Sequence, residues 1–84
     1  GVGRVGDANG VEKISLPRET DWRRLVDSVM IDWHYDGAVL RPETVDIPEK
    51  NALVRGVYDI PEDCGTIRVK ITDLRSESME IEVP

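Results

Sequence analysis

The chain has 84 residues, with 11 basic against 17 acidic side chains and a formal net charge of −6. Its length fits one small domain with a thin core, in which most large apolar side chains are needed for packing. The acidic balance disfavours a general nucleic-acid binder and a protein that lies on an anionic membrane, because both usually present a basic face.

Cys64 is the only cysteine, so the fold cannot contain an internal disulfide. A free thiol fits a reducing compartment, and we expect a cytoplasmic protein. No apolar run approaches the roughly 20 residues of a membrane span, and no signal peptide is recognisable, so we expect no membrane partner. Because the chain does not begin with Met, we expect it to be a piece of a longer protein.

Residues 1–10, GVGRVGDANG, are rich in glycine and predict a flexible linker or tail before a single domain over residues 11–84. The spacing of Gly1, Gly3 and Gly6 formally matches the Gly-x-Gly-x-x-Gly fingerprint of dinucleotide-binding folds. That fingerprint requires a strand before it and a helix after it, and neither fits a start followed by Asp-Ala-Asn-Gly. We therefore expect no nucleotide and no other cofactor.

The segment from Val11 to Asp36 predicts two strands joined by a helical turn. Val11 to Leu16 is typical of a strand, whereas the apolar spacing over residues 20–28 favours one short helical turn. From Val29 the period changes to two, as in a half-buried strand that ends at the Asp36-Gly37 turn pair. The side chains expected to face the core are Val29, Ile31, Trp33 and Tyr35, and those expected to face solvent are Met30, Asp32, His34 and Asp36.

The remainder of the chain predicts further strands separated by turns. Residues 41–51 have two prolines and the polar spacing of a loop or edge strand, and residues 53–60 read as a strand. Residues 66–72 and 79–83 predict a hairpin whose basic and acidic outer faces lie side by side. The pattern predicts an all-β antiparallel β-sandwich. Its expected core is Val29, Ile31, Trp33, Val57 or Tyr58, Ile67, Val69, Ile71 and Ile81.

Asp32, His34 and Asp36 are the residues that most resemble a metal or catalytic site, since one imidazole and two carboxylates can ligate a divalent cation. Alternate positions on a straight strand lie about 6.5–7 Å apart and diverge, whereas metal ligands must converge to within about 2–2.5 Å of the ion. We therefore expect neither a metal ion nor catalysis here. Cys64 follows two acidic residues, which disfavour a reactive thiolate.

A basic cluster beside one aromatic side chain is the candidate interaction patch. A local positive patch on an acidic domain could meet a phosphate backbone. Each arginine also has an acidic neighbour, which favours ordinary surface ion pairs. The patch consists of Arg18, Trp22, Arg23 and Arg24.

Two stretches resemble strands of PKD-like, immunoglobulin-type domains. Residues 58–83 are similar to the final strands of these domains, which carry a Tyr, a Pro or acidic turn, a Gly, alternating aliphatic residues and an Asp that opens the last hairpin. Residues 31–37, IDWHYDG, resemble their Trp-bearing central strand. The resemblance implies an immunoglobulin-like β-sandwich. The matching positions in the first stretch are Tyr58, Pro61, Gly65, Ile67, Val69, Ile71 and Asp73.

More narrowly, residues 21–37 followed by residues 69–73 resemble an accessory domain at the C-terminal end of adenine-specific DNA methyltransferases, the modification subunits of type III-like restriction–modification systems. The Asp-Pro-Pro-Tyr motif and the cofactor-binding motif of those enzymes have no counterpart in this sequence. The resemblance therefore implies a non-catalytic domain that positions DNA or a partner subunit. Its partners would be other domains or subunits of the parent protein, with weak or no nucleic-acid binding of its own.

Two other functions stay open. An immunoglobulin-like module of a secreted or surface protein could bind carbohydrate or protein, although the free Cys64 argues against an oxidising setting. A small metal-dependent enzyme that uses Asp32, His34 and Asp36 ranks last, because the three side chains are expected to diverge.

Overall fold

A computed structural model of the protein describes residues 3–6, 8–16, 26–49 and 53–83. These residues form β-strands joined by turns and loops, and none of them is helical. The strands are β1 (Gly3–Gly6), β2 (Glu12–Ser15), β3 (Val26–Asp32), β4 (Thr44–Asp46), β5 (Val57–Asp59), β6 (Ile67–Asp73) and β7 (Ser78–Val83).

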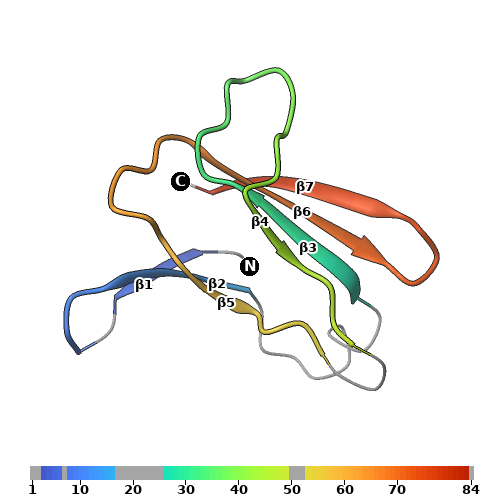
Figure 1. Ribbon diagram of the computed structural model, residues 1–84, viewed down its shortest axis with the longest axis horizontal. Helices are drawn as coiled ribbons and strands as arrows, with labels where there is room; N and C mark the ends of the chain where they lie inside the picture. Colours follow the sequence, from blue (N-terminus) through green and yellow to red (C-terminus); the bar gives the residue numbers. More distant parts are fainter. Residues whose placement is uncertain (1–2, 7, 17–25, 50–52, 84) are drawn as a thin grey trace.

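The strands form two antiparallel sheets that lie in two layers (Figure 1). The smaller sheet has the order β1-β2-β5, and the larger sheet has the order β4-β3-β6-β7. In an immunoglobulin constant-type sandwich the fourth strand lies beside the fifth, with the order 1-2-5-4 opposite 3-6-7. Here β4 pairs with β3 instead, and the rest of the order is the same. The predicted all-β antiparallel sandwich is confirmed.

The core lies between the two sheets and is built mainly from inward-facing residues of their strands. Ile14 and Tyr58 come from the smaller sheet, and Ile31 and Val69 come from the larger one. Ile71 is only half-buried, as is Ile81 on the edge strand β7. The buried apolar cluster consists of Ile14, Leu16, Val26, Val29, Ile31, Trp33, Val54, Tyr58, Ile67, Val69 and Val83.

The predicted linker over residues 1–10 is wrong for residues 3–6, which form β1. This strand pairs with β2 in continuous register, from Gly3 opposite Ser15 to Gly6 opposite Glu12. Without β1, the backbone N–H and C=O groups along that side of β2 would lack strand partners, and pairing them outweighs the conformational freedom that glycine loses. Gly10, at φ 78°, lies in the turn that follows, where a left-handed conformation favours glycine.

The predicted helical turn near residues 20–28 is wrong at its C-terminal end, where Val26 to Ser28 belong to β3. Residues 20–25 lie outside the described residues. A shift in the register between β3 and β6 falls between Val26 and Ser28, and such a bulge breaks the alternation of a strand. Val26 and Val29 are therefore both buried although they are three residues apart. That spacing imitates one turn of a helix in the sequence.

The predicted hairpin over residues 66–83 is confirmed as β6 and β7, with Lys70 opposite Glu80 in continuous register. Its turn lacks the glycine or asparagine that the pattern leads one to expect. Ser76 instead adopts φ 65°, and the Asp73 carboxylate accepts the backbone N–H groups of Arg75 and Glu77. These two side-chain bonds satisfy backbone donors of the turn and offset the strain at Ser76.

Candidate functional site

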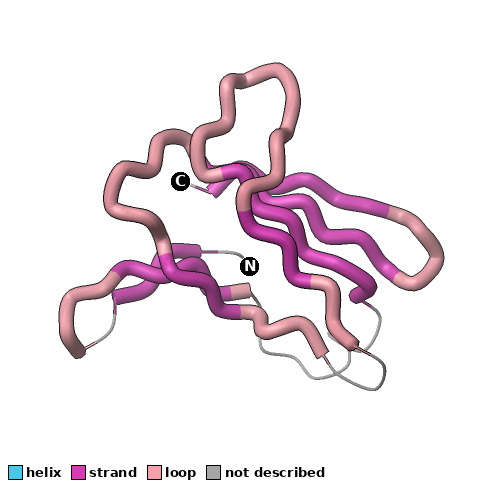
Figure 2. Tube along the Cα trace, viewed as in Figure 1, coloured by secondary structure: helices cyan, strands magenta, loops and turns pink. Residues whose placement is uncertain are grey.

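The candidate site lies at one end of the sandwich, where two loops meet. One loop, residues 33–43, joins β3 to β4, and the other, residues 60–66, joins β5 to β6; both are drawn as pink tube in Figure 2. Backbone hydrogen bonds of 2.8 Å hold the loops together, from Tyr35 N–H to the Thr66 carbonyl and from Gly65 N–H to the Trp33 carbonyl. The loops thus form one surface, which includes His34 and Asp36.

Asp32 is buried, with 3% of its surface exposed, and the expectation that it faces solvent is wrong. Its carboxylate accepts the backbone N–H of His34 at 2.9 Å and that of Arg41 at 2.9 Å. A carboxylate can be buried when hydrogen-bond donors of the protein replace the water molecules that it loses. Asp32 therefore holds two points of the backbone of the loop over residues 33–43.

Asp36 also holds this loop in place. It begins the predicted Asp-Gly turn, in which Gly37 has φ 89°. One carboxylate oxygen accepts the backbone N–H groups of Ala38 and Val39 at 2.8 and 3.0 Å. The other oxygen accepts the Arg41 guanidinium at 2.7 Å. The two backbone donors first, and Arg41 after them, hold the pKa of Asp36 below its usual value.

His34 uses both nitrogens of its ring, one for a contact within its own loop and the other for a contact with the second loop. Nδ1 lies 2.8 Å from a carboxylate oxygen of Glu43, and Nε2 lies 2.9 Å from the backbone carbonyl of Asp63. The same Glu43 oxygen accepts the backbone N–H of Trp33 at 2.9 Å. Glu43 and Asp63 are the partners that sequence reasoning missed, because they are 9 and 29 residues from His34 and no local spacing relates them.

We expect the link through His34 to weaken as the pH rises. Both ring partners are acceptors, so both bonds form only when the ring is a doubly protonated imidazolium. The hydrogen bond to Glu43, then the bond to the Asp63 carbonyl, raise the pKa of His34 above 6.5, and desolvation opposes them. Because the folded-state pKa is the higher one, the stabilisation is fully present below the unfolded-state pKa and is lost as the pH rises through the folded-state pKa.

The measurement is an NMR pH titration of the ring protons of His34, the one histidine of the chain. We expect a midpoint above 6.5 that moves back toward that value in Glu43→Gln. Asp63→Asn is the matched control: it keeps the backbone carbonyl that contacts the ring and removes only the charge of a carboxylate 4.0 Å from Nε2, the smallest of the causes that raise the pKa, so it should move the midpoint less than Glu43→Gln does. A wild-type midpoint at or below 6.5 would contradict the geometry of the link.

The side chains of Asp32, His34 and Asp36 each form hydrogen bonds within the protein. Within the described part of the chain, no group of three or more His, Cys, Asp or Glu side chains is placed to hold a metal ion. The free thiol of Cys64 is half-buried in the second loop. That no metal binds and no catalysis occurs stays a prediction.

The arrangement presents an ordered loop to solvent. Between Asp36 and Glu43, the carboxylates of Asp32 and Asp36 hold the backbone through N–H groups of the loop. Val39 lies in this segment with 59% of its surface exposed. We call this segment the ordered loop, residues 36–43. Arg41 of the same loop is also exposed, with its guanidinium held by Asp36. Binding residues are disproportionately found on such loops, carried by a rigid scaffold.

Arg18, Trp22, Arg23 and Arg24, the predicted interaction patch, all lie outside the described residues. No protein-family model matches the chain. Searches of curated proteins and of solved structures also find no match. The resemblance to PKD-like domains and to methyltransferase accessory domains therefore stays a prediction from the residues. Among the residues that the structure describes, no helix is long and apolar enough to cross a membrane.

Proposed function

We propose that this sandwich is a non-catalytic interaction module of a larger DNA-modification protein, in which it positions a partner subunit or DNA. The ordered loop is the observation that supports an interaction role. Its backbone is fixed by the carboxylates of Asp32 and Asp36, and Val39 is a large apolar side chain among its exposed residues. A loop that is ordered before binding loses less entropy when the complex forms. The link to DNA modification rests on the resemblance of residues 21–37 and 69–73.

Protein contacts suit this module better than direct contacts with phosphate. Non-specific affinity for DNA comes mainly from clustered Lys and Arg that release counterions. Several described basic side chains already pair with carboxylates: Arg4 with Glu12, Lys13 with Asp59, Arg41 with Asp36, and Arg68 with Glu80. A phosphate would compete with these carboxylates, against a formal net charge of −6.

The test is an NMR titration of the isotope-labelled chain in two arms. One arm adds the catalytic domain of an adenine-specific methyltransferase of a type III-like system, and the other adds duplex DNA at two salt concentrations. We expect the catalytic domain to shift the amide signals of Ala38 and Val39, and Val39→Asp to abolish the shifts. Val45→Asp is the matched control, because Val45 is also about half-exposed but lies on the edge strand β4.

In the DNA arm we expect no shifts at either salt concentration. Shifts that grow as salt is lowered, and that disappear in a variant with Arg23 and Arg24 replaced by alanine, would assign direct DNA binding to the predicted patch. Unchanged amide signals with the catalytic domain would contradict the proposed function. A coding sequence for a signal peptide and sandwich repeats on the N-terminal side would favour the secreted or surface module instead.

A further inference from the structure

β7 is the longest edge strand among the described residues. It has six residues, whereas the edge strands β4 and β5 have three each and β1 has four, of which two are glycine. Natural edge strands are often protected by short length, proline, a bulge or charged side chains, lysine above all. The sequence of β7, SMEIEV, has no proline and no lysine, its register with β6 is continuous, and its charged residues are the two glutamates of one face. Its free side can therefore receive another strand.

The register identifies which backbone groups point to the free side. Asp73 N–H donates to the Glu77 carbonyl at 2.8 Å, so this pair is one of the hydrogen-bonded pairs of the antiparallel ladder. Such pairs alternate along the strands, and the next ones involve Met79 and Ile81 on β7. The N–H and C=O groups of the intervening residues point away from β6, where no other described strand lies. These residues are Ser78, Glu80 and Glu82.

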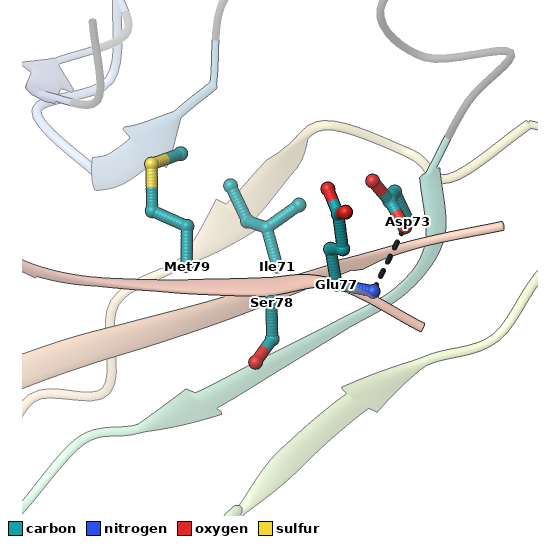
Figure 3. A pocket seen from close by; sticks show the side chains of 5 residues that line it. All are labelled: Ile71, Asp73, Glu77, Ser78 and Met79. Carbon is teal, nitrogen blue, oxygen red and sulfur yellow. Dashed lines mark hydrogen bonds between the residues drawn. The ribbon is translucent and has the colours of Figure 1, made fainter. Parts of the chain in front are cut away.

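The inner face of the hairpin end offers a place for an apolar side chain. Met79 lies on this face with 56% of its surface exposed, next to the half-buried Ile71. They line a hollow of about 230 Å³, together with Asp73, Glu77 and Ser78. Figure 3 shows Met79 and Ile71 pointing to the same side of the hairpin. Methionine adapts its shape to different apolar partners, which suits a contact of this kind.

The outer face of β7 carries two glutamates, Glu80 and Glu82, that lie beside basic side chains of β6. Arg68 of β6 lies 2.9 Å from the Glu80 carboxylate and 3.9 Å from that of Glu82, and Lys70 is directly opposite Glu80. The strand that β7 pairs with thus carries basic side chains outward and aliphatic side chains inward. Charged cross-strand pairs of opposite sign stabilise a sheet, and like charges opposite each other destabilise it.

That charge rule disfavours a second copy of this chain as the occupant of the free edge. In an antiparallel pair, directly opposite residues lie on the same face of the sheet. Two β7 strands paired about a two-fold axis would therefore place their outer rows, each with Glu80 and Glu82, against each other. An occupant with Lys or Arg in that row would instead meet opposite charge.

We propose that the free edge of β7 binds an extended segment of another protein by strand addition, and that this segment carries Lys or Arg at alternate positions with aliphatic residues between them. Its backbone bonds to Ser78, Glu80 and Glu82, its basic side chains lie beside the two glutamates, and one aliphatic side chain packs against Met79. Backbone bonds supply affinity in this mode of recognition, and the alternate side chains supply specificity. The inference rests on the proposed interaction role but uses a surface separate from the ordered loop.

The experiment measures fluorescence anisotropy of two labelled peptides titrated with the full 84-residue chain. The first peptide has the sequence TIRVKITD of residues 66–73, the strand that β7 already accepts, and the second has Glu in place of its Arg and Lys. We expect saturable binding of the basic peptide and binding weaker by about tenfold or more for the acidic one. Equal binding of both peptides, or of neither, would overturn the proposal.

Glu80→Pro is the decisive variant. It removes an N–H that points to the free side and leaves the N–H groups that bond to β6, and proline is tolerated at such positions of edge strands. We expect about a tenfold loss of affinity for the basic peptide, with an unchanged circular dichroism spectrum. Glu80→Gln keeps the N–H and should mainly reduce the preference for the basic peptide. Val45→Asp, on β4 at the opposite edge of the sheet, should leave peptide binding unchanged.

Amide NMR signals separate strand addition from the other occupancies. Shifts at Ser78, Glu80 and Glu82 with unchanged signals along β3 support addition at the free edge. Shifts along β3 would mean that the peptide replaces β6. A dimer in sedimentation that is lost in Glu80→Pro would mean that a second copy of the chain occupies the edge. Either result overturns the proposal. Loop shifts with the catalytic domain, combined with no peptide binding, would refute strand addition and leave the interaction role standing.

Discussion

Replacing Trp33 with alanine should lower the free energy of unfolding by about 3–5 kcal/mol, as large-to-small changes of buried aromatic residues do. Only 3% of the Trp33 surface is exposed, and the side chain belongs to the buried apolar cluster between the sheets. Its indole N–H donates to the Thr44 hydroxyl at 2.8 Å, which joins the end of β3 to β4. Since small domains are stable by only about 5–15 kcal/mol, the variant should lose a large share of its stability.

Urea unfolding followed by circular dichroism measures this loss. Trp33→Phe keeps most of the buried ring but removes the donor to Thr44, and we expect it to cost about 1 kcal/mol for the hydrogen bond in addition to the smaller ring. Val39→Ala, on the exposed ordered loop, should change stability by less than about 0.5 kcal/mol. A loss of that small size for Trp33→Ala would mean that Trp33 is a surface residue, and would make it a candidate for binding.

The hairpin of β6 and β7, with its basic and acidic outer faces side by side, could be predicted because its alternation is long and uninterrupted. Val69 and Lys70 show the pattern: the aliphatic residue is buried, and the basic residue lies opposite a glutamate on the other face. The N-terminal end of β3 could not be predicted in the same way, since the bulge between Val26 and Ser28 breaks the period of two. A local pattern reports the strand only while the pleat is regular.

β1 and the burial of Asp32 escaped prediction for a related reason, since both depend on contacts between distant parts of the chain. Glycine at residues 3 and 6 disfavours a strand by local propensity, and the pairing with β2 overrides it. Asp32 occupies an outward position of β3, yet the backbone of Arg41 covers and satisfies it. Neither effect leaves a mark in the residues immediately around these positions.

At the candidate site, the turn at Asp36-Gly37 could be predicted from the sequence, whereas the contacts of His34 with distant residues could not. The turn at Asp36-Gly37 follows from its own residues, because aspartate accepts backbone N–H groups two and three positions on and glycine takes a positive φ. The partners of His34 follow from topology instead. The β3–β4 pairing places Glu43, and the loop before β6 places Asp63, so the link appears only once both sheets are assembled.

Tyr58 and Asp46 form a hydrogen bond that joins the two sheets directly. Tyr58 lies on β5 of the smaller sheet with 1% of its surface exposed, and its hydroxyl donates to the carboxylate of Asp46 on β4 of the larger sheet at 2.6 Å. The same hydroxyl accepts the backbone N–H of Gly56, and the same carboxylate oxygen accepts that of Arg55. The bond is therefore the centre of a small network between the sheets.

Tyr58→Phe should lower the free energy of unfolding by about 1.5–3 kcal/mol, the range for hydrogen bonds to charged groups. Asp46→Ala should also be costly, because it leaves the buried Tyr58 hydroxyl without its acceptor. Since both variants remove the same bond, the double variant should lose less than the sum of the two single losses. Urea unfolding of the four proteins gives the coupling, and strictly additive losses would show that the bond contributes nothing.

The same bond predicts how stability changes at alkaline pH. Burial first, and the hydrogen bond to Asp46 second, raise the pKa of Tyr58 well above its ordinary value of 10.0. Because the folded-state pKa is the higher one, the folded state keeps its proton above about pH 10 while the unfolded state releases it. The contribution of Tyr58 is thus fully present below about pH 10 and declines as the pH rises from there toward the folded-state pKa. Urea unfolding across this range should show a decline that is smaller in Tyr58→Phe, and an equal decline in both proteins would contradict the assignment.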